Sequence, residues 1–253
     1  MTNPDTDALV TPLGWDSGHF GLSIARIADN AAPTGDLDTA YQWCAKNDVD
    51  VAYLLCSAAN LAIAHRASQL GFRLVDLRLT FAMPIHRWAA NARTARATVR
   101  PTIQSDIATL VEIARTAHRD TRFRADGRFA PDKCDEVYSN WLASAIDGAA
   151  DAVFTAIHGD KPVGYVTAHL DPSEAGLVGR IGLIAVAEQA RGSGAGRALV
   201  HHACEWFSQN QVEELVVGTQ GVNTGAAALY ESSGYRLKTV DTWYHAWLDR
   251  DQR

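Results

Sequence analysis

The sequence predicts a mixed α/β domain from about residue 97 onward. Strand-like and helix-like patterns alternate along this part of the chain, and two β runs flank a turn sequence, G-D-K-P, at 159–162. An apolar strand at 182–187 also runs directly into a glycine-rich loop and a helical pattern. Alternation of this kind is typical of a sheet covered by helices.

Each expected element follows from its own pattern. Strands carry short apolar or alternating runs between turn residues, and helices carry apolar residues at spacings of three and four. In chain order we expect a strand over 97–103, helices over 105–117 and 132–146, a hairpin over 152–170, a strand over 182–187, a helix over 195–207, a strand over 214–219, a short helix over 223–233 and closing β structure over 235–248.

The loop E-Q-A-R-G-S-G-A-G-R-A-L, at 188–199, is suited to an anionic ligand. Its glycines let the backbone adopt positive φ and let amides approach a ligand, and the helix that follows adds unpaired N–H groups and a positive dipole end. A phosphate is the expected ligand, although such a loop alone also fits a flexible surface connection. The dinucleotide pattern G-x-G-x-x-G and the Walker pattern G-K-[ST] are both absent.

The composition limits the class of protein. With 47% hydrophobic and 21% charged residues it is ordinary for a globular chain, and a net charge of −6 argues against nucleic acid as a partner. No apolar run is long enough to cross a membrane, and the start M-T-N-P-D-T-D does not resemble a signal peptide. We therefore expect a cytoplasmic protein with no membrane partner.

Neither a disulfide framework nor a metal site is expected. The four cysteines are scattered without a C-x-x-C pair. His201, His202 and Cys204 form the only local metal-like cluster, and adjacent histidines on a helix point in different directions.

Two motifs carry a resemblance to a known family. Q-A-R-G-S-G at 189–194 matches the Q/R-x-x-G-x-G/A acyl-CoA loop of the GCN5-related N-acetyltransferases (GNAT), and N-T-G-A-A-A-L-Y-E-S-S-G-Y at 223–235 is similar to that family's second signature. The resemblance implies a GNAT fold, in which helices flank a central mixed, mostly antiparallel sheet. It also implies acetyl-CoA as co-substrate and no metal.

The resemblance further implies which residues act. Loop amides would hold the pyrophosphate of acetyl-CoA, and the edge of strand 183–186 would pair with the pantetheine arm and face the thioester carbonyl. Tyr230 occupies the family's general-acid position, and a phenol holds its proton near neutral pH. Packing of a core tyrosine and helix capping by Asn223 are the structural alternatives. The expected cofactor-binding residues are Leu183, Ile184, Ala185, Val186, Arg191, Gly192, Ser193, Gly194, Ala195, Gly196 and Asn223.

The general base has no clear candidate. Many relatives carry a carboxylate on the central strand, but L-V-G-R-I-G-L-I-A-V at 177–186 has none. Deprotonation through water, or binding of an amine that is already neutral, fits better. His169 and Glu174 are the fallback bases.

The first part of the chain carries a weaker copy of the same plan. Asn60 stands eleven residues before Gly71, the spacing that separates Asn223 from Gly234. Ala67 stands where the second copy has its tyrosine, and no glycine loop precedes it. A chance match of helix–turn–strand chemistry is the alternative. We expect a degenerate, non-catalytic GNAT-like half at 1–85, a linker at 86–96 and a catalytic GNAT domain at 97–253.

Further segments look like parts of the dTDP-fucosamine acetyltransferases. They are L-G-W-D-S-G-H-F-G at 13–21, T-R-F-R-A-D-G-R-F at 121–129, V-G-T-Q-G-V-N-T-G-A-A-A-L-Y at 217–230 and W-Y-H-A-W-L at 243–248. This resemblance implies that the acceptor is the 4-amino group of a dTDP-4-amino-4,6-dideoxyhexose. One departure is Leu229, where a basic residue is expected, which puts one contact to a cofactor phosphate in doubt.

Three residues are expected at the acceptor: Arg122, Phe123 and Arg124. The two arginines would clamp a pyrophosphate through forked, charge-assisted hydrogen bonds, or else be solvated or ion-paired. Trp15 and Phe20 would stack on a base or sugar, although packing is the commoner use of large aromatic residues.

These observations together predict acetyl-CoA-dependent N-acetylation of a small amine, with a nucleotide-linked amino sugar as the leading acceptor. An aminoglycoside or a polyamine is the alternative acceptor, and a non-catalytic acetyl-CoA sensor is the alternative class. Tyr230 in register with Asn223 favours the enzyme, because a sensor needs no acid there. Association of two chains as a homodimer stays open.

Overall fold

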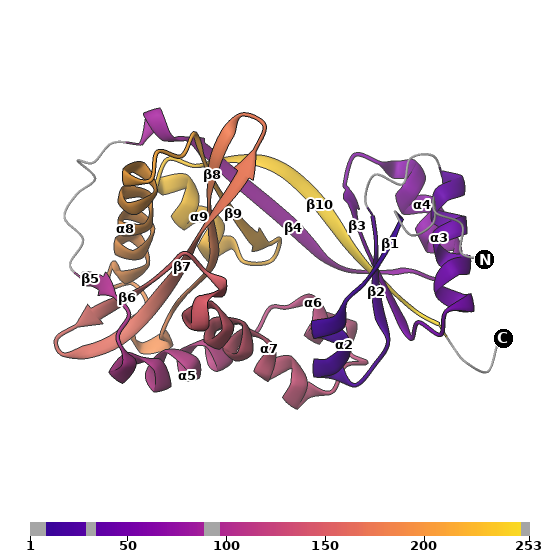
Figure 1. The fold of residues 1–253 in the computed structure, drawn as a ribbon, viewed down its shortest axis with the longest axis horizontal. Coiled ribbons are helices and arrows are strands. Elements are labelled where there is room, and N and C mark those ends of the chain that lie inside the picture. The colour runs from indigo at the N-terminus through magenta and orange to yellow at the C-terminus, as the bar shows by residue number, and fades with distance from the viewer. Residues whose placement is uncertain (1–8, 29–33, 89–96, 249–253) are drawn as a thin grey trace. The chain divides into compact units, whose positions relative to one another are not determined.

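The computed structural model describes residues 9–28, 34–88 and 97–248 (Figure 1). The chain forms two compact units. The first unit comprises residues 1–78, 120–134 and 239–253, and the second comprises 79–119 and 135–238. No helix among the described residues is long and apolar enough to span a membrane.

The second unit contains a mixed, mostly antiparallel sheet, as the sequence predicts. Its strand order is β4-β9-β8-β7-β6-β5, in which only β8 and β9 among the described pairs are parallel. The strands are β4 (Arg73–Pro84), β5 (Thr98–Pro101), β6 (Ala152–His158), β7 (Lys161–Ser173), β8 (Gly176–Val186) and β9 (Glu214–Gln220). The helices are α5 (Ile107–Ala117), α7 (Pro131–Ser144), α8 (Ala195–Gln209) and α9 (Thr224–Ser232), with short turns η1 (Ile85–Arg87), η2 (Gln104–Asp106), η3 (Ala145–Ala149) and η4 (Glu188–Ala190).

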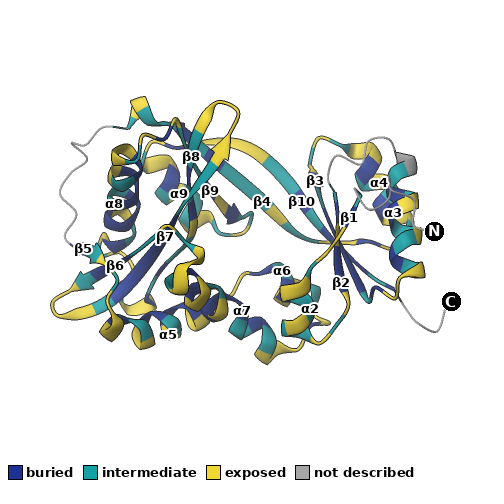
Figure 2. Ribbon diagram, in the orientation of Figure 1, coloured by how far each residue is buried: buried dark blue, intermediate teal, exposed yellow. Residues whose placement is uncertain are grey.

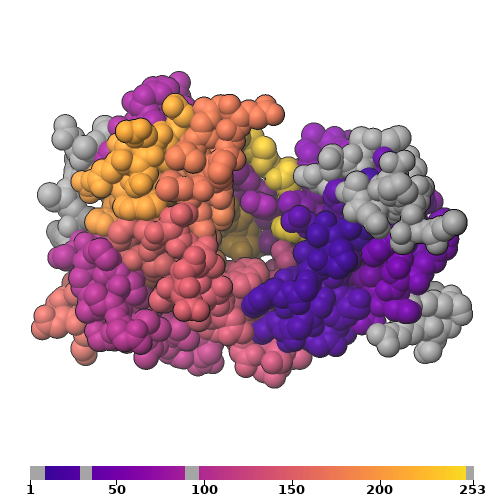
Figure 3. Space-filling view, viewed as in Figure 1, coloured from indigo at the N-terminus to yellow at the C-terminus, as the bar shows by residue number. Residues whose placement is uncertain are grey.

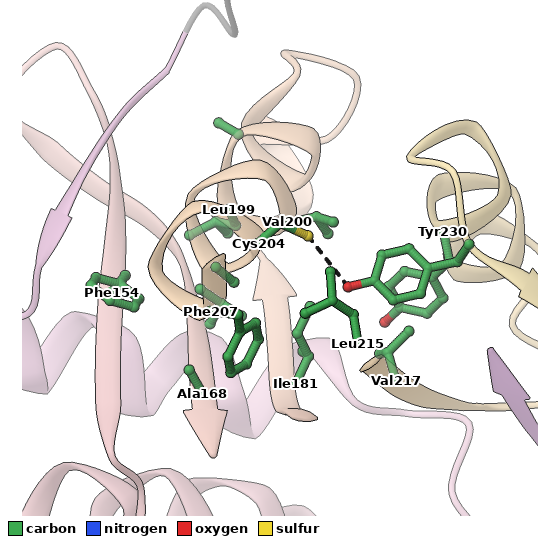
Figure 4. Packing of buried hydrophobic residues seen from close by; sticks show 14 of the residues in the cluster. Phe154, Ala168, Ile181, Leu199, Val200, Cys204, Phe207, Leu215, Val217 and Tyr230 are labelled. Atoms are coloured by element: carbon green, nitrogen blue, oxygen red, sulfur yellow. Dashed lines mark hydrogen bonds between the residues drawn. The ribbon is translucent and has the colours of Figure 1, made fainter. Parts of the chain in front are cut away.

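Helices cover both faces of this sheet. On one face, α8 and α9 pack against alternate residues of β7, β8 and β9, among them Ala168, Ile181 and Val217 (Figure 4). On the other face, α5 and α7 pack against the intervening residues Tyr165 and Ala185. Successive side chains of a strand point to opposite faces, so helices on both sides bury the middle of β7, while β8 is mostly half-buried (Figure 2).

The first unit has the strand order β1-β2-β3-β10. Its strands are β1 (Val10–Pro12), β2 (Ile24–Ile27), β3 (Val51–Ser57) and β10 (Arg236–Trp247), and its helices are α2 (Gly14–Phe20), α3 (Thr34–Lys46), α4 (Leu61–Gln69) and α6 (Arg122–Asp126). Residues of α3 and α4 share one hydrophobic core with alternate residues of these strands.

The two units repeat one local plan. Strands β3 and β9 have 7 residues each, helices α4 and α9 have 9, and strands β4 and β10 have 12. Four parallel pairs join β2 to β3, and four join β8 to β9. Asparagine caps both short helices, at Asn60 and Asn223, and a glycine with positive φ follows each, Gly71 at 85° and Gly234 at 99°. The similarity between the two parts of the sequence is therefore also present in their structures.

The two copies differ in the segment that connects the parallel strand, β2 or β8, to the long helix that follows it, α3 or α8. In the first copy, β2 ends at Ile27 and α3 begins at Thr34, and no glycine lies between them. In the second copy, β8 continues five residues beyond its last pairing with β9 and is followed by the glycine loop. The sequence of the first copy therefore has no glycine loop at this place.

The units divide the chain differently from the predicted segments at 1–85, 86–96 and 97–253. Strand β4 begins in the first unit and ends in the second, whereas β10 begins in the second and ends in the first. There, Asp241–Trp247 pair antiparallel with β3 and bury Tyr244 and Ala246 in its core. Residues 120–134, between α5 and α7, also belong to the first unit. Of the expected linker, η1 covers the start, and residues 89–96 lie outside the described residues.

Candidate active site

At the centre of the second unit, the parallel pairing between β8 and β9 ends before β8 itself ends. The ladder between β8 and β9 runs from Val178 opposite Glu214 to Ile181 opposite Val217, and goes no further among the described residues. Strand β8 nevertheless continues to Val186. One edge of β8 beyond Ile181 is therefore available to an extended ligand that can pair with backbone groups.

The other edge of this part of β8 is occupied by β7. Ile184, Ala185 and Val186 pair antiparallel with β7, and the amide of Ala187 donates to the carbonyl of Val163 at 2.8 Å. Backbone groups alternate between the two edges of a strand, so the amides of Ile184 and Val186 point to the unpaired edge. This edge is where the sequence places the pantetheine arm.

A bulge marks the point where the pairing ends. The register between β7 and β8 shifts between Val166 and Ala168, and the hydroxyl of Thr167 accepts a hydrogen bond from the amide of Leu183 at 2.8 Å. Gly182 is needed here, because a Cβ at this position would lie 2.4 Å from Nε2 of His169. Bulges commonly re-aim a strand beside a functional site.

The glycine loop that follows has unpaired amides. Gly192 and Gly194 have φ of 78° and 93°, values that disfavour a side chain, and a Cβ on either would meet nothing within 4 Å. Gly194 precedes α8 without a side-chain cap. Four amides of the loop and first helical turn have no hydrogen-bond partner within the described chain, namely those of Gly192, Gly194, Gly196 and Arg197. With the dipole of a 15-residue helix behind them, these amides suit an anion.

The remaining loop residues divide into exposed and packed positions. Arg191 is exposed and Ser193 is partly buried, whereas Ala195 lies in the core at 1% exposure and contributes only its backbone to a ligand. A Cβ on Gly196 would lie 3.3 Å from Leu229, so this glycine lets α8 approach α9 closely. Leu229 itself packs against the core, which accounts for an apolar residue where a basic one is expected.

Helix α9 carries the two signature residues. The side-chain oxygen of Asn223 accepts from the amide of Ala226 at 3.0 Å, so Asn223 caps the helix, as one of the alternatives predicts. Tyr230 is 2% exposed, and its ring lies 5.8 Å from that of Phe81 and 6.1 Å from that of Tyr235. Burial raises the pKa of Tyr230, so its hydroxyl stays protonated at neutral pH and can donate to a developing anion.

The three residues expected at the acceptor lie in the first unit. The guanidinium of Arg122 stacks on the rings of Trp243, Phe123 and Tyr53 at 4.2, 4.4 and 4.8 Å. It also forms an ion pair of 3.7 Å with Asp16. This enclosure matches the ion-paired alternative for Arg122.

Phe123 is 1% exposed and packs against Phe20 and Phe129. Phe20 thus has the packing role that was the commoner expectation. Arg124 is exposed, and its amide donates to the hydroxyl of Thr121 at 3.2 Å.

The fallback bases differ in their surroundings. Glu174 is exposed at the tip of the β7–β8 hairpin, which projects from the second unit (Figures 1 and 3). His169 lies at the bulge, with Nε2 3.3 Å from the hydroxyl of Thr167. Burial, helped by the charge of Arg180, lowers the pKa of His169.

No group of three metal-ligating residues occurs in the described parts of the chain. The His201, His202 and Cys204 group packs instead: His202 contacts the ring of Phe154, and Cys204 bonds the hydroxyl of Tyr235 at 3.4 Å (Figure 4). All four cysteines are free and buried.

Residues 110–235 match the profile of the Acetyltransferase (GNAT) family. This part of the chain is a GNAT acetyltransferase domain. The spore coat polysaccharide biosynthesis protein SpsD of Bacillus subtilis is 24% identical over 153 residues, which cover 60% of this chain and 52% of that protein. The chain spans about half or less of the length of the curated relatives that it matches.

Solved structures support the fold over more of the chain. A GCN5-related N-acetyltransferase from Sphaerobacter thermophilus aligns over 94% of this chain and 76% of its own, with a TM-score of 0.68 and 16% identity. A tandem GNAT protein from the clavulanic acid biosynthesis pathway aligns over 90% and 76%, with a TM-score of 0.60 and 14% identity. The prediction of a GNAT fold preceded by a second GNAT-like half agrees with these neighbours.

Within the GNAT domain, sequence reasoning predicted a site at the loop, the strand edge and α9, and it did not mark Thr167. The hydroxyl of Thr167 anchors the bulge, and this residue is fully buried. A threonine inside an apolar strand gives no distinctive signal. Gly182, on the neighbouring strand β8, is compatible with a close contact. Residue spacing in the sequence does not show that this contact is with Thr167 and His169.

Proposed function

We propose that the chain transfers the acetyl group of acetyl-CoA to the 4-amino group of a nucleotide-linked 4-amino-4,6-dideoxyhexose, most closely a dTDP-sugar. The observation that carries the cofactor assignment is the unpaired edge of β8 beyond Ile181, which leads into a loop whose amides lack partners. An extended, polar arm that ends in phosphates fits both features at once.

The cofactor is held by backbone more than by side chains. The amides of Ile184 and Val186 pair with the pantetheine arm, and the amides of Gly192, Gly194 and Gly196 receive the pyrophosphate. Arg191 adds a charge beside the phosphates. Asn223, whose side-chain oxygen is used in the cap, offers its amide nitrogen to the cofactor.

The reaction is a direct attack. The acceptor nitrogen adds to the thioester carbonyl, and backbone amides at the β8 edge stabilise the charge that develops on the carbonyl oxygen. The carbon–sulfur bond then breaks. Tyr230 gives its proton to the departing thiolate, a role that suits a phenol kept protonated by burial.

The sugar acceptor rests on resemblance and on one relative. SpsD is named for polysaccharide biosynthesis. Arg124, which is exposed, is the residue we propose to contact the nucleotide phosphates. Phe123 and Arg122 lie beside it on α6 and support its position.

We propose that the first half is a degenerate, non-catalytic copy. It retains the asparagine cap of α4, but Ala67 stands in place of the tyrosine. The sequence between Ile27 and Thr34 contains no glycine, so the first copy has no counterpart of the glycine loop.

Another small amine, such as an aminoglycoside or a polyamine, is the second candidate acceptor, and a non-catalytic acetyl-CoA sensor is the candidate from another class. The sensor is favoured by one observation, the lack of a carboxylate on β8. The exposed, positively charged Arg124 on α6 argues against a polycation as the acceptor.

The test is thiol release from acetyl-CoA with a panel of dTDP-4-amino-4,6-dideoxyhexoses, spermidine and an aminoglycoside. We expect release with one amino sugar and a loss of about 10²–10⁴-fold in kcat for Tyr230→Phe, the range typical of general acids. Tyr235→Phe is the matched control, because Tyr235 is equally buried in the same core and its hydroxyl bonds the thiol of Cys204. Acetylation of spermidine or the aminoglycoside alone would refute the sugar acceptor. Binding of acetyl-CoA without turnover would favour the sensor.

A further inference from the structure

His118, which was not a candidate in the sequence analysis, lies beside the part of the sheet where β8 and β9 are no longer paired. His118 directly follows α5. Its Nε2 lies 2.9 Å from the hydroxyl of Tyr165 on β7, and its ring stacks on that of Tyr138 on α7 with centroids 4.1 Å apart and planes at 13°. Contacts to two other elements, β7 and α7, hold this imidazole in one orientation.

The cluster spans both strands of the interrupted pair. Tyr165 is paired with Ala185 of β8 and shares a core with it and with Leu183. Tyr138 accepts a hydrogen bond of 3.2 Å from Gln220, the last residue of β9, three positions beyond the last pairing with β8. His118 therefore sits where β8 and β9 have separated.

His118 and Tyr230 belong to opposite faces of the same sheet. Tyr165, the partner of His118, packs with α5 and α7, whereas Tyr230 packs with α8. A thioester carbonyl held along the β8 edge between these faces would have one proton-transfer group on each side. Direct attack by an amine needs such an arrangement, because the nucleophile enters on one side and the thiolate leaves on the other.

The two nitrogens of His118 have different environments. Nε2 is engaged by Tyr165, which is fully buried. Nδ1 has no partner in the portion of the chain that the structure describes, and it is not one of the buried polar atoms that lack a partner. Nδ1 is therefore open to solvent or to a ligand. A hydroxyl both donates and accepts, so Tyr165 can hold the ring in either tautomer.

We propose that His118 is the general base of the acetyl transfer and takes the proton of the acceptor ammonium at Nδ1. The ammonium N–H bond breaks and an Nδ1–H bond forms, which leaves a neutral amine and an imidazolium whose Nε2–H donates to Tyr165. The amine lone pair then attacks the thioester carbonyl, the carbon–sulfur bond breaks, and the thiolate takes the proton of Tyr230. The new amide nitrogen loses its second amine proton to solvent, the phenolate of Tyr230 regains a proton from solvent, and the imidazolium of His118 releases its proton to solvent. This inference rests on the proposed acetyl transfer, though not on a sugar acceptor.

The electrostatics around His118 support this role. Burial, and to a lesser extent the charge of Arg191, lowers the pKa of His118 to about 4, so the free imidazole is neutral at pH 7. The titratable side chains in contact with it are the phenols of Tyr138 and Tyr165. On α5, Arg115 is paired with Glu112. Cofactor phosphates near Arg191 would cancel its charge and raise the pKa of His118.

The experiment compares His118→Gln with His169→Gln in the full chain. Glutamine keeps a hydrogen-bonding group for Tyr165, and His169 is the matched control, a second partly buried histidine whose Nε2 binds Thr167. kcat/KM is measured from pH 5.5 to 9.5 with the amine that the thiol-release panel selects. Methoxyamine, which is neutral throughout this range, is the second nucleophile.

We expect His118→Gln to lower kcat/KM for the ammonium acceptor about 10²–10⁴-fold at pH 7. The loss shrinks as pH rises toward the pKa of the amine, KM for acetyl-CoA is unchanged, and methoxyamine is acetylated nearly as fast as by the wild type. An equal loss at every pH and for both nucleophiles would show a structural role and overturn the proposal. The proposal would also be overturned if His169→Gln, and not His118→Gln, showed a loss that shrinks with rising pH and spares methoxyamine.

A second readout needs no acceptor. The proposal predicts that CoA raises the pKa of the His118 imidazole, followed by NMR of histidine-labelled protein, and that Arg191→Gln removes most of this rise. An unchanged pKa in the CoA complex would overturn the proposal. If only non-sugar amines are acetylated, the sugar acceptor fails while the test of His118 proceeds with those amines.

Discussion

Replacing the two helix-capping asparagines separates stability from cofactor binding. Asn60 and Asn223 accept hydrogen bonds of 3.2 and 3.0 Å from the amides of Ile63 and Ala226, at equivalent places in the two copies. Removing an asparagine cap costs about 1 kcal/mol. Asn60→Ala and Asn223→Ala should therefore each lower Tm by about 2–4 °C in a chain of this size.

Aspartate variants separate the two roles. Aspartate caps helices as well as asparagine does, so Asn60→Asp and Asn223→Asp should leave Tm nearly unchanged. At Asn223, however, the change replaces an amide nitrogen proposed to meet the cofactor with a carboxylate that repels phosphates. We expect Asn223→Asp to weaken acetyl-CoA binding about 10-fold or more, equivalent to about 1.4 kcal/mol, and Asn60→Asp to bind as the wild type does.

Thermal unfolding followed by far-UV circular dichroism gives Tm, and isothermal titration calorimetry gives Kd for acetyl-CoA. The Asn60 variants control for the loss of an equivalent cap in the copy without a glycine loop. Wild-type affinity in Asn223→Asp would refute the placement of the cofactor beside α9. Equal losses of affinity in Asn60→Asp and Asn223→Asp would also refute it.

Two further predictions concern the cores of the two units. Gly179→Ala should destabilise the chain by about 1–3 kcal/mol, because its Cβ would lie 2.6 Å from the fully buried ring of Phe207; an unchanged urea midpoint would contradict this. Burial lowers the pKa of His245 to about 4 although its Nδ1 lies 2.7 Å from Asp126, whereas the unfolded value is 6.5. As the pH falls, the unfolded state therefore binds a proton before the folded state does. This histidine's contribution to the free energy of unfolding should be complete above about pH 6.5 and should fall by roughly 2–3 kcal/mol toward pH 4. Urea midpoints that do not change between these pH values would contradict the prediction.

Local patterns predicted the elements of the second unit well. The apolar spacing at 195, 198, 199, 203 and 206 gave α8, and all of these residues are buried except Trp206, which is partly buried. The turn G-D-K-P gave the β6–β7 hairpin. Such features depend on neighbours in sequence, so one sequence contains the information that they need.

Long-range features could not be predicted in this way. Nothing in R-L-K-T-V-D-T-W-Y-H-A-W shows that β10 leaves the second unit and pairs with β3 in the first. The segment around Phe123 likewise belongs to the first unit because of contacts with Phe20, about a hundred positions away. Partner choice in a sheet depends on the whole topology and not on the strand's own pattern.

The residues of the candidate site also divide into those that local sequence patterns predict and those that depend on long-range contacts. The loop and α9 signatures are short and contiguous, so they were visible in the sequence. His118 was not, because its partners Tyr138 and Tyr165 come from two other elements, α7 and β7. A lone histidine at the end of a helix carries no motif.

The measurement that tests the central claim most directly is amide hydrogen exchange, followed by NMR with and without acetyl-CoA. The account predicts that acetyl-CoA slows exchange at Ile184 and Val186 on the free β8 edge and at Gly192, Gly194 and Gly196 in the loop. The amides of β2, the strand of the first copy that corresponds to β8, should not change. Binding of acetyl-CoA that leaves the β8 and loop amides unprotected, or that protects the first copy instead, would contradict the account.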